Sequence, residues 1–403
     1  MGRVSTPDVA QRLADTPAVR DTILRAAAGA RGLPGEDPRA MSHSWLFTGP
    51  PGAGRSQAAL AFAAALMCER GEELGCGECA SCRGILEEGR HTDLVYLRPQ
   101  ELSIAVDTVR DIIGQAASRP TVARWRVIIF ENADRLTDGA ANALLKTVEE
   151  PTASTVIVML APSADPEDFS QTLRSRCRHL YIPAPSTEAI VSQLVAEGAG
   201  ESDARLAAVT SLRHVGRARR LVTDPTVQRR RAQSINLAEE VFQGAQGFQA
   251  AGALIKAIEK ESKEAGAEAD EKEKADLEKA YGAGGKGKGA AKAQRDVRSA
   301  VKDLEKIQKK RATRRVRDLL DLALVDLAGI YRDALMLRVG ADVEMTHPDF
   351  SGLAQELAQR VGEEGLVACQ EAIVTCRNHI AVNVAPGTAF DGLVGRLRRA
   401  CGA

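Results

Sequence analysis

The chain has 403 residues with 54 basic and 54 acidic side chains, and 44% of its residues are apolar. This length predicts two or three domains, and the balanced charge excludes a protein that is basic over its whole surface. Aromatic residues make up only 3%, so the cores must be built mainly from Ala, Leu, Val and Ile. The sequence has no run of about 18 apolar residues, which excludes a membrane-spanning helix.

The first residues lack the apolar segment of a secretory signal. We therefore expect a cytoplasmic protein in a reducing compartment. Its eight cysteines are then expected to be thiols or metal ligands rather than disulfides.

Short apolar runs alternate with helical stretches through the first 183 residues. Strands are predicted at residues 45–47, 93–97, 127–130, 156–160 and 179–182. Helices are predicted at residues 57–67, 107–117 and 139–150. Strands that alternate with helices predict an α/β domain with a parallel sheet.

Strand signals stop after residue 183. Residues 184–225 are predicted to form a small helical unit, and residues 226–403 a longer all-helical domain. Residues 319–339 are apolar on more than one helical face, which is typical of a helix buried from several sides. That helix could pack against another subunit or could form the centre of the domain's own core.

The helical domain contains a low-complexity insertion at about residues 262–300, where an acidic segment is followed by a basic one. Residues 259–280 carry nine acidic and five basic side chains, whereas residues 282–317 carry thirteen basic and three acidic ones. The Gly- and Lys-rich stretch 282–293 cannot form a packed core and is predicted to be a flexible loop. The sequences that flank this stretch could form long charged helices.

A glycine-rich turn lies directly after the first strand and before the first helix. Residues 49–56 read Gly-Pro-Pro-Gly-Ala-Gly-Arg-Ser, a pattern typical of loops that hold phosphates with backbone N–H groups at a helix N-terminus. The pattern predicts cofactor contacts at Gly49, Gly52, Gly54, Arg55 and Ser56.

In that loop Arg55 occupies the place of the usual lysine. A lysine is a compact point charge, whereas the arginine fork is bulkier and differently shaped. ATP binding is therefore possible but is expected to be weak or absent. The alternative is a strand–helix turn without a ligand.

The strand at 127–130 is followed by Glu131 and Asn132, where a hydrolysing phosphate-loop protein would carry two acids. Glu131 could still orient Mg²⁺ and is a further predicted cofactor contact. Asn132 can hold a water molecule but cannot take its proton. Hydrolysis is expected to be weak or absent.

Four cysteines lie within fifteen residues, at Cys68, Cys76, Cys79 and Cys82. Four thiolates suit a tetrahedral structural zinc ion, and glycines between them allow tight turns. The alternative is a loop that carries four reduced thiols.

Two arginine clusters lie outside these motifs. Arg174, Arg176 and Arg178 precede the last predicted strand, where an arginine could complete the phosphate site of a neighbouring subunit. Arg217, in the small helical unit, could reach a bound nucleotide. Solvated surface charge is the alternative for both clusters.

Taken together, these motifs resemble the AAA+ subunits of the bacterial DNA polymerase III clamp loader, and among them the delta-prime type. The resemblance rests on HSWLFTGPPGAGRS, the cysteine block, DTVRDII, NALLKTVEEP and the SRC tripeptide, in that order. The motor subunits of this family carry an intact lysine loop and a strand that ends in Asp-Glu. This chain has an altered loop but keeps the SRC arginine, which is the delta-prime pattern.

The resemblance implies an AAA+ domain at 1–183 with a zinc module at 68–82, a helical lid at 184–225 and an oligomerisation collar at 226–403. It implies that Arg176 acts as an arginine finger on the adjacent subunit's ATP. The implied partners are the gamma/tau and delta subunits, the sliding clamp and, through the complex, primed DNA. The chain would have no independent catalysis but would belong to a DNA polymerase holoenzyme.

Three functions compete at this point. The first is a stator that does not hydrolyse ATP and supplies one arginine to a neighbour. The second is an active AAA+ ATPase motor of the gamma/tau type. The third is a DNA-binding module that uses the basic segment 282–317, because basic stretches bind phosphates without sequence preference.

Overall fold

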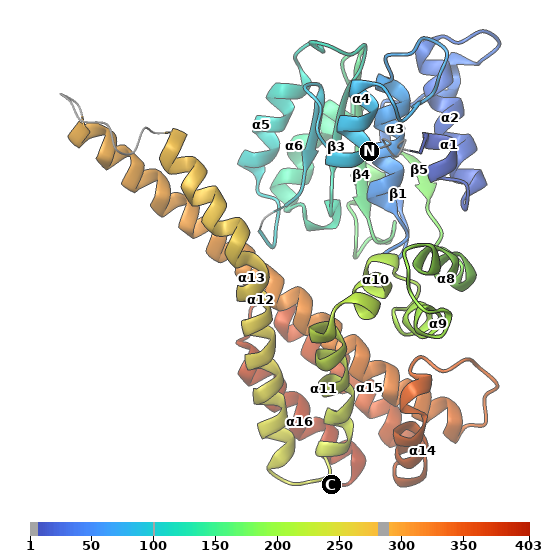
Figure 1. Ribbon diagram of the computed structural model, residues 1–403, viewed down its shortest axis with the longest axis vertical. Coiled ribbons are helices and arrows are strands. Elements are labelled where there is room, and N and C mark those ends of the chain that lie inside the picture. Colours follow the sequence, from blue (N-terminus) through green and yellow to red (C-terminus); the bar gives the residue numbers. More distant parts are fainter. Residues whose placement is uncertain (1–6, 100, 281–289) are drawn as a thin grey trace. The chain divides into compact units, whose positions relative to one another are not determined.

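The computed structural model describes residues 7–99, 101–280 and 290–403, with the backbone alone for residues 290–296. The chain forms two compact units (Figure 1). One comprises Met1–Gly198 and Arg213–Arg217, and the other Ala199–Leu212 and Ala218–Ala403. Among the described residues, none of the helices combines the length and apolarity needed to cross a bilayer.

A five-stranded sheet forms the centre of the first unit. Its strands are β1 (Ser44–Thr48), β2 (Leu94–Leu97), β3 (Arg126–Phe130), β4 (Thr155–Ala161) and β5 (Arg178–Tyr181). The strand order is β2-β3-β4-β1-β5, and every neighbouring pair is parallel. The predicted α/β fold class and all five predicted strands are confirmed.

Helices cover both faces of this sheet (Figure 1). They are α1 (Val9–Arg12), α2 (Pro17–Arg31), α3 (Arg55–Met67), α4 (Ala80–Arg83), α5 (Val106–Ala116), α6 (Asp138–Glu149) and α7 (Gln171–Arg174), with short 3₁₀ turns at Pro38–Ala40 and Ala133–Arg135 and a π turn at Gly84–Glu88. The unit's remaining helix, α8 (Thr187–Ala196), follows the last strand and does not cover the sheet. Side chains of β1 alternate between the two faces: Trp45 and Phe47 pack with α2 and α3, and Leu46 packs with α5 and α6.

No helix is predicted above before the first strand, yet α2 carries clear boundary signals. It begins at Pro17, whose fixed φ angle suits the first helical position, and it ends at Gly32 in the left-handed conformation. The pattern could therefore have been detected from the sequence.

The second unit is entirely helical among its described residues. Its helices are α9 (Glu201–Thr210), α10 (Val215–Thr223, whose first three residues belong to the first unit), α11 (Pro225–Glu240), α12 (Gln246–Ala280), α13 (Ala290–Arg338), α14 (Ser351–Arg360), α15 (Glu363–Ala381) and α16 (Pro386–Cys401), with a 3₁₀ turn at Pro348–Phe350. The predicted lid, 184–225, thus contributes residues to both units.

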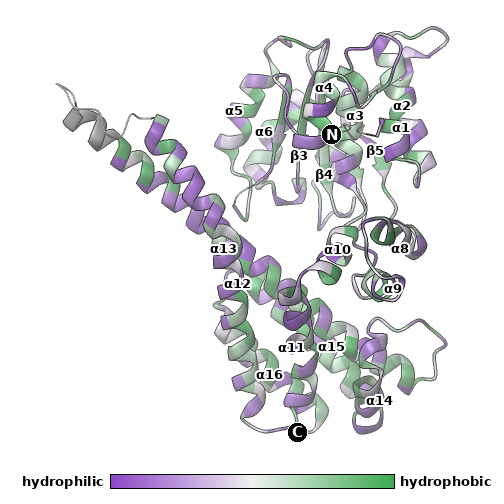
Figure 2. Ribbon diagram, in the orientation of Figure 1, coloured by the Kyte–Doolittle hydropathy of each residue, from purple (hydrophilic) through white to green (hydrophobic). Residues whose placement is uncertain are grey.

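The apolar stretch at 319–339 is the centre of this unit's own core. Leu320, Leu324, Ile330 and Tyr331 of α13 are fully buried, and they pack with apolar residues of α11, α12, α14, α15 and α16. Figure 2 shows these apolar helix segments together. Of the two alternatives for this stretch, the structure supports a central core helix.

The predicted flexible stretch 282–293 is described only in part. Residues 282–289 lie outside the described residues, whereas residues 290–293 belong to α13. The prediction was wrong for these four residues, because Ala-Ala-Lys-Ala consists of strong helix formers that extend the following helix.

Candidate functional site

The glycine-rich loop joins β1 to α3 in the conformation that its sequence predicts. Gly52 and Gly54 have φ angles of 83° and 85°, in the left-handed region that glycine adopts without a steric cost. Gly54 is the N-cap of α3 and makes no side-chain cap hydrogen bond. The loop therefore brings the N–H groups of a helix N-terminus to the end of β1, as a phosphate site requires.

Ser56 and Glu131 meet at the carboxyl ends of the strands, although they are far apart in sequence. The Ser56 hydroxyl donates a hydrogen bond of 2.8 Å to Oε1 of Glu131. Nε of Arg98 lies 3.7 Å from Oε2 of the same carboxylate. The structure thus brings together two of the predicted cofactor contacts and fixes the carboxylate beside the helix N-terminus.

Arg55 is half-buried beside the same carboxylate, and its Nη1 atom has no hydrogen-bond partner in the part of the chain that is described. Burial lowers the pKa of this guanidinium, while Asp134 and Glu131 raise it. Burial in turn raises the pKa of Asp134. The cation at the lysine position therefore lies in the electrostatic field of two acids of its own chain, although no ion pair joins it to either acid among the described residues.

His214 lies directly against the phosphate loop. A Cβ atom placed on Gly52 would come within 2.4–2.7 Å of the Cγ, Cβ and Cα atoms of His214. Burial, followed by the charges of Arg217 and Arg55, lowers the pKa of His214, against an opposing backbone hydrogen bond. Arg217 is buried, and its backbone N–H donates to Nδ1 of His214 at 3.3 Å. The predicted nucleotide contact at Arg217 is thus placed beside the loop, on a turn whose importance the sequence analysis missed.

Asn132 follows β3 by two residues and adopts a left-handed conformation, with φ 56° and ψ 53°. Asparagine tolerates this conformation better than most residues. The backbone alone therefore accounts for an asparagine at this position.

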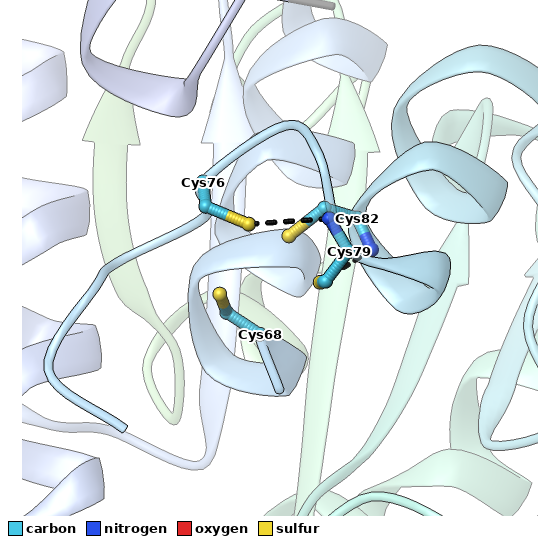
Figure 3. A group of neighbouring side chains, drawn as sticks. All are labelled: Cys68, Cys76, Cys79 and Cys82. Carbon is cyan, nitrogen blue, oxygen red and sulfur yellow. Dashed lines mark hydrogen bonds between the residues drawn. The ribbon is translucent and has the colours of Figure 1, made fainter. Parts of the chain in front are cut away.

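The four cysteines of the predicted zinc module converge at the C-terminal end of α3 (Figure 3). Their sulfur atoms all lie within 4.8 Å of one another. Zinc–sulfur bonds of about 2.3 Å in a tetrahedron require sulfur separations of about 3.8 Å. The residues therefore fit a four-thiolate site, and a metal ion could be held there.

Backbone N–H groups already point at these sulfur atoms. Cys76 Sγ accepts from the N–H groups of Glu78 and Cys79 at 3.4 and 3.3 Å, and Cys79 Sγ accepts from Cys82 at 3.4 Å. A hydrogen bond from Cys82 lowers the pKa of Cys68, against the effect of burial. Such bonds stabilise thiolates and orient them toward a cation.

A chain of polar contacts supports the cysteine module from one side. Oε1 of Glu69 accepts 2.8 Å hydrogen bonds from both the backbone N–H and the hydroxyl of Ser81. The Ser81 hydroxyl lies 3.0 Å from Nε2 of His91, and Nδ1 of His91 accepts from the backbone N–H of Asp93 at 3.0 Å. These contacts link the cysteine loop to the start of β2.

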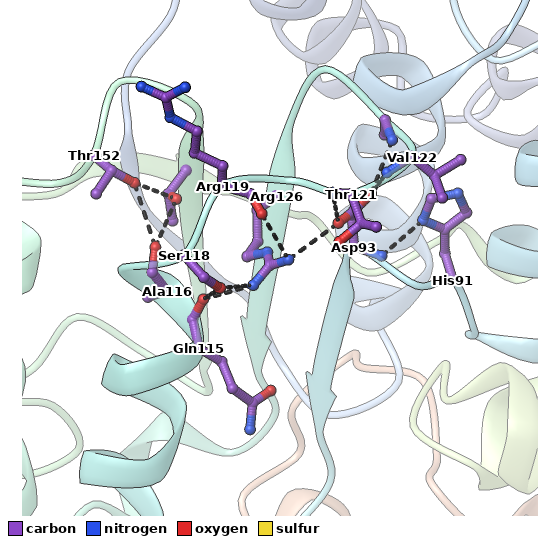
Figure 4. A network of polar contacts seen from close by, with 12 residues as sticks. His91, Asp93, Gln115, Ala116, Ser118, Arg119, Thr121, Val122, Arg126 and Thr152 are labelled. Carbon is purple, nitrogen blue, oxygen red and sulfur yellow. Dashed lines mark hydrogen bonds and ion pairs between the residues drawn. The ribbon is translucent and has the colours of Figure 1, made fainter.

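Asp93 is fully buried and holds the loop before β3 (Figure 4). Its carboxylate accepts from the backbone N–H groups of Thr121, Val122 and Ala123 at 2.6–2.8 Å and from Nη2 of Arg126 at 3.1 Å. Burial raises the pKa of Asp93, but these donors outweigh it and hold the pKa at about 2. The acid is therefore ionised at every physiological pH.

Arg176 lies between α7 and β5, the edge strand of the sheet. Its side chain is 36% exposed and forms an ion pair with Glu149 at the end of α6. Its Nη1 atom also donates to the carbonyl oxygen of Thr172 at 2.9 Å and to Ser175 Oγ at 3.1 Å. Arg176 is thus oriented at the edge of the sheet, and the sequence analysis missed Glu149 as its partner.

Comparisons with known proteins concern mainly this first unit. Residues 37–186 match the family described as "DNA polymerase III, delta subunit". The delta-prime subunit of Pseudomonas aeruginosa is 36% identical over 156 residues, 38% of this chain and 47% of that protein.

Residues 37–186 are similar to the corresponding part of clamp-loader delta-prime and tau subunits.

Relatives of the clamp-loader delta-prime/tau type include both subunit kinds. The Bacillus subtilis delta-prime subunit is 31% identical over 203 residues, 50% of this chain and 60% of that protein. The tau subunit of the same organism is 34% identical over 155 residues, 38% of this chain and 27% of that protein. The matches thus span about a quarter to three fifths of these relatives, and they include both delta-prime and tau subunits.

Proposed function

We propose that this chain is a delta-prime subunit of the DNA polymerase III clamp loader, which assembles with gamma/tau and delta subunits and helps to load the sliding clamp onto primed DNA. In this proposal it hydrolyses no ATP itself. It supplies Arg176 to the ATP site of a neighbouring motor subunit.

The observation that carries this proposal is the state of Arg55. Its guanidinium occupies the lysine position of the phosphate loop, where it is half-buried and electrostatically engaged by Asp134 and Glu131. His214 lies against Gly52 of the loop. The loop thus lacks the compact lysine that contacts phosphates, and Asn132 offers no base for the attacking water.

The geometry of Arg176 supports its action on another subunit. The side chain is partly exposed beside the edge strand, and Glu149 and the carbonyl oxygen of Thr172 hold its fork. A planar arginine fork can stabilise the charge that develops on a transferred phosphoryl group.

The test is ATP hydrolysis by a clamp loader reconstituted with clamp and primed DNA. We expect Arg176→Ala to lower the stimulated rate by about tenfold or more without preventing assembly, and Arg176→Lys to restore little because lysine lacks the fork. Arg174→Ala is the matched control, because Arg174 is an exposed neighbour whose guanidinium contacts Gln171 at 3.2 Å. An unchanged rate with Arg176→Ala would contradict the proposal that Arg176 acts on the ATP site of a neighbouring subunit.

A second candidate, an ATPase motor, is favoured by one contact. The 2.8 Å hydrogen bond from Ser56 to Glu131 joins the two groups that a phosphate-loop enzyme uses to place Mg²⁺. Turnover of ATP by the isolated chain at about 1 per second or more would support the motor and contradict the stator.

We also propose that the cysteine module holds one structural zinc ion. Four protein thiolates fill a tetrahedral site and leave no open position for chemistry. Elemental analysis of protein purified without a chelator should give one zinc per chain, and protein free of metal would contradict this proposal.

A further inference from the structure

The distal half of α12 and the first half of α13 pair as an antiparallel hairpin (Figure 1). The Ser262 hydroxyl donates to the carbonyl oxygen of Ala312 at 3.3 Å. Further along the hairpin, Nζ of Lys274 lies 3.2 Å from Oε1 of Glu305. Residue numbers rise on one helix as they fall on the other, so the pairing is continuous and in register.

Acids of α12 neutralise the arginines on the inner face of α13. Arg311 Nη1 donates to Glu273 Oε1 at 2.8 Å, and its Nη2 lies 3.3 Å from Oδ1 of Asp270. The hydrogen bond from Arg311 lowers the pKa of Glu273. Arg315 lies against Gly266, where a Cβ atom would come within 2.0 Å of its Nη2. These arginines stabilise the pairing of α12 with α13.

The outer face of α13 carries a second set of cations. Arg298, Lys302 and Lys309 are exposed, and their spacing of four and seven residues places them on one side of the helix. Glu305, which the same periodicity places between Lys302 and Lys309, is neutralised by its ion pair with Lys274 of α12. At 1.5 Å per residue the three cations span about 17 Å. Within the described ranges, none of the three takes part in an ion pair. We call these three residues the outer stripe.

The side chains on and around the outer stripe favour a regular polyanion as its partner over a single strand or a membrane surface. Residues 290–317 contain no aromatic side chain, so bases could not stack there as they do on proteins that hold single strands. Val297 is buried, Val301 and Leu304 are half-buried, and among the Val, Leu and Ile side chains of residues 297–310 only Ile307 is exposed. This segment therefore lacks the broad apolar face that a membrane-surface helix requires.

We propose that the outer stripe binds the phosphate backbone of duplex DNA without sequence preference. Duplex DNA presents about one negative charge per 1.7 Å of its axis, and a rigid helix with unpaired cations can lie along such a rod without rearrangement. Lysine and arginine contacts to phosphates position a protein but read no sequence. This inference is independent of the stator assignment and is tested on the isolated full chain.

The experiment measures binding of a fluorescent duplex of about 30 base pairs by anisotropy in a salt series from about 50 to 200 mM. The variant replaces the whole stripe: Arg298→Gln, Lys302→Gln and Lys309→Gln. Since each neutralised phosphate contributes about 0.9 to the salt slope, we expect the slope to fall by up to about 2.7 and the affinity at low salt to fall at least tenfold.

The matched control removes the same charge from α12. Lys256→Gln, Lys263→Gln and Lys272→Gln change three exposed lysines, and we expect their affinity for the duplex to stay within about twofold of the unmodified chain. Circular dichroism checks that both variants keep their helix content.

Three outcomes would overturn the proposal. The first is no binding of duplex at the lowest salt, and the second is an equal loss in the two variants. The third is tighter, stripe-dependent binding of a single strand of equal length or of phosphatidylserine vesicles, which would assign the stripe to a different partner.

Discussion

The two ends of α3 present two candidate sites that differ in how well their side chains suit a ligand. At its N-terminus the loop geometry of a phosphate site is intact, but Arg55 lies in the electrostatic field of Asp134 and Glu131, and His214 abuts Gly52. At its C-terminus Cys68 begins a cluster of four thiols whose sulfur atoms are already within 4.8 Å.

This difference shows that backbone geometry alone does not make a site competent. Both ends depend on glycines in left-handed conformations, such as Gly54 and Gly77. At the cysteine end the donor atoms suit the expected ion and a polar frame supports them. At the phosphate end the cation is an arginine whose pKa is lowered by burial, in place of the compact lysine of an intact phosphate loop.

The largest effect is expected when one thiol of the cysteine cluster is removed. We expect Cys82→Ser to abolish zinc binding and to lower the free energy of unfolding by on the order of 5 kcal/mol, less than the roughly 10–16 kcal/mol of isolated zinc-finger peptides because the sheet core remains. Elemental analysis and thermal unfolding measure the two effects. The control is Cys177→Ser, which changes a half-buried cysteine outside the cluster. This variant should still bind one zinc ion per chain. Full zinc content in Cys82→Ser would show that the cluster is not the metal site.

A smaller effect is expected from the frame beside the cysteine module. Asp93→Asn leaves the charge of Arg126 buried without its partner and should cost about 3–5 kcal/mol. Urea unfolding at neutral pH measures this loss. Asp107→Asn breaks an exposed pair with Arg110 and should change stability by less than about 1 kcal/mol.

The low pKa of Asp93 predicts that the stability of the fold depends on pH. The pKa of Asp93 is about 2 in the folded chain and about 3.9 when unfolded, so ionisation stabilises the fold above about pH 4. This contribution, about 2.6 kcal/mol, is lost as the pH falls through 2. Asp93→Asn should remove this part of the acid sensitivity, and an identical acid profile for both proteins would contradict the assignment.

The smallest effect is expected at the phosphate end. Arg55→Lys should restore the compact cation and tighten ATP binding by no more than about tenfold, measured by titration calorimetry. Turnover should stay below about 1 per second, because Asn132 cannot accept a proton. Adding Asn132→Glu introduces a base but costs about 1–2 kcal/mol in the left-handed conformation. Ready turnover by Arg55→Lys alone would show that the loop cation was the only defect.

Local sequence patterns are enough to predict the sheet, the phosphate-loop turn and the cysteine cluster. These features are local: β-branched runs such as residues 127–130 form strands, glycines mark turns, and the four cysteines occupy fifteen residues. The first and last cysteines are close enough in the chain that a helix end and two turns bring their sulfur atoms together.

Only the tertiary structure decided which charges meet. Glu149 pairs with Arg176, and His214 reaches Gly52, across separations that no local pattern records. In the hairpin, the basic segment reads as one run in sequence, yet Arg311 is neutralised by α12 whereas Lys309 is exposed. The physical reason is that helical periodicity fixes the face on which a side chain lies, but packing between elements fixes what that face contacts.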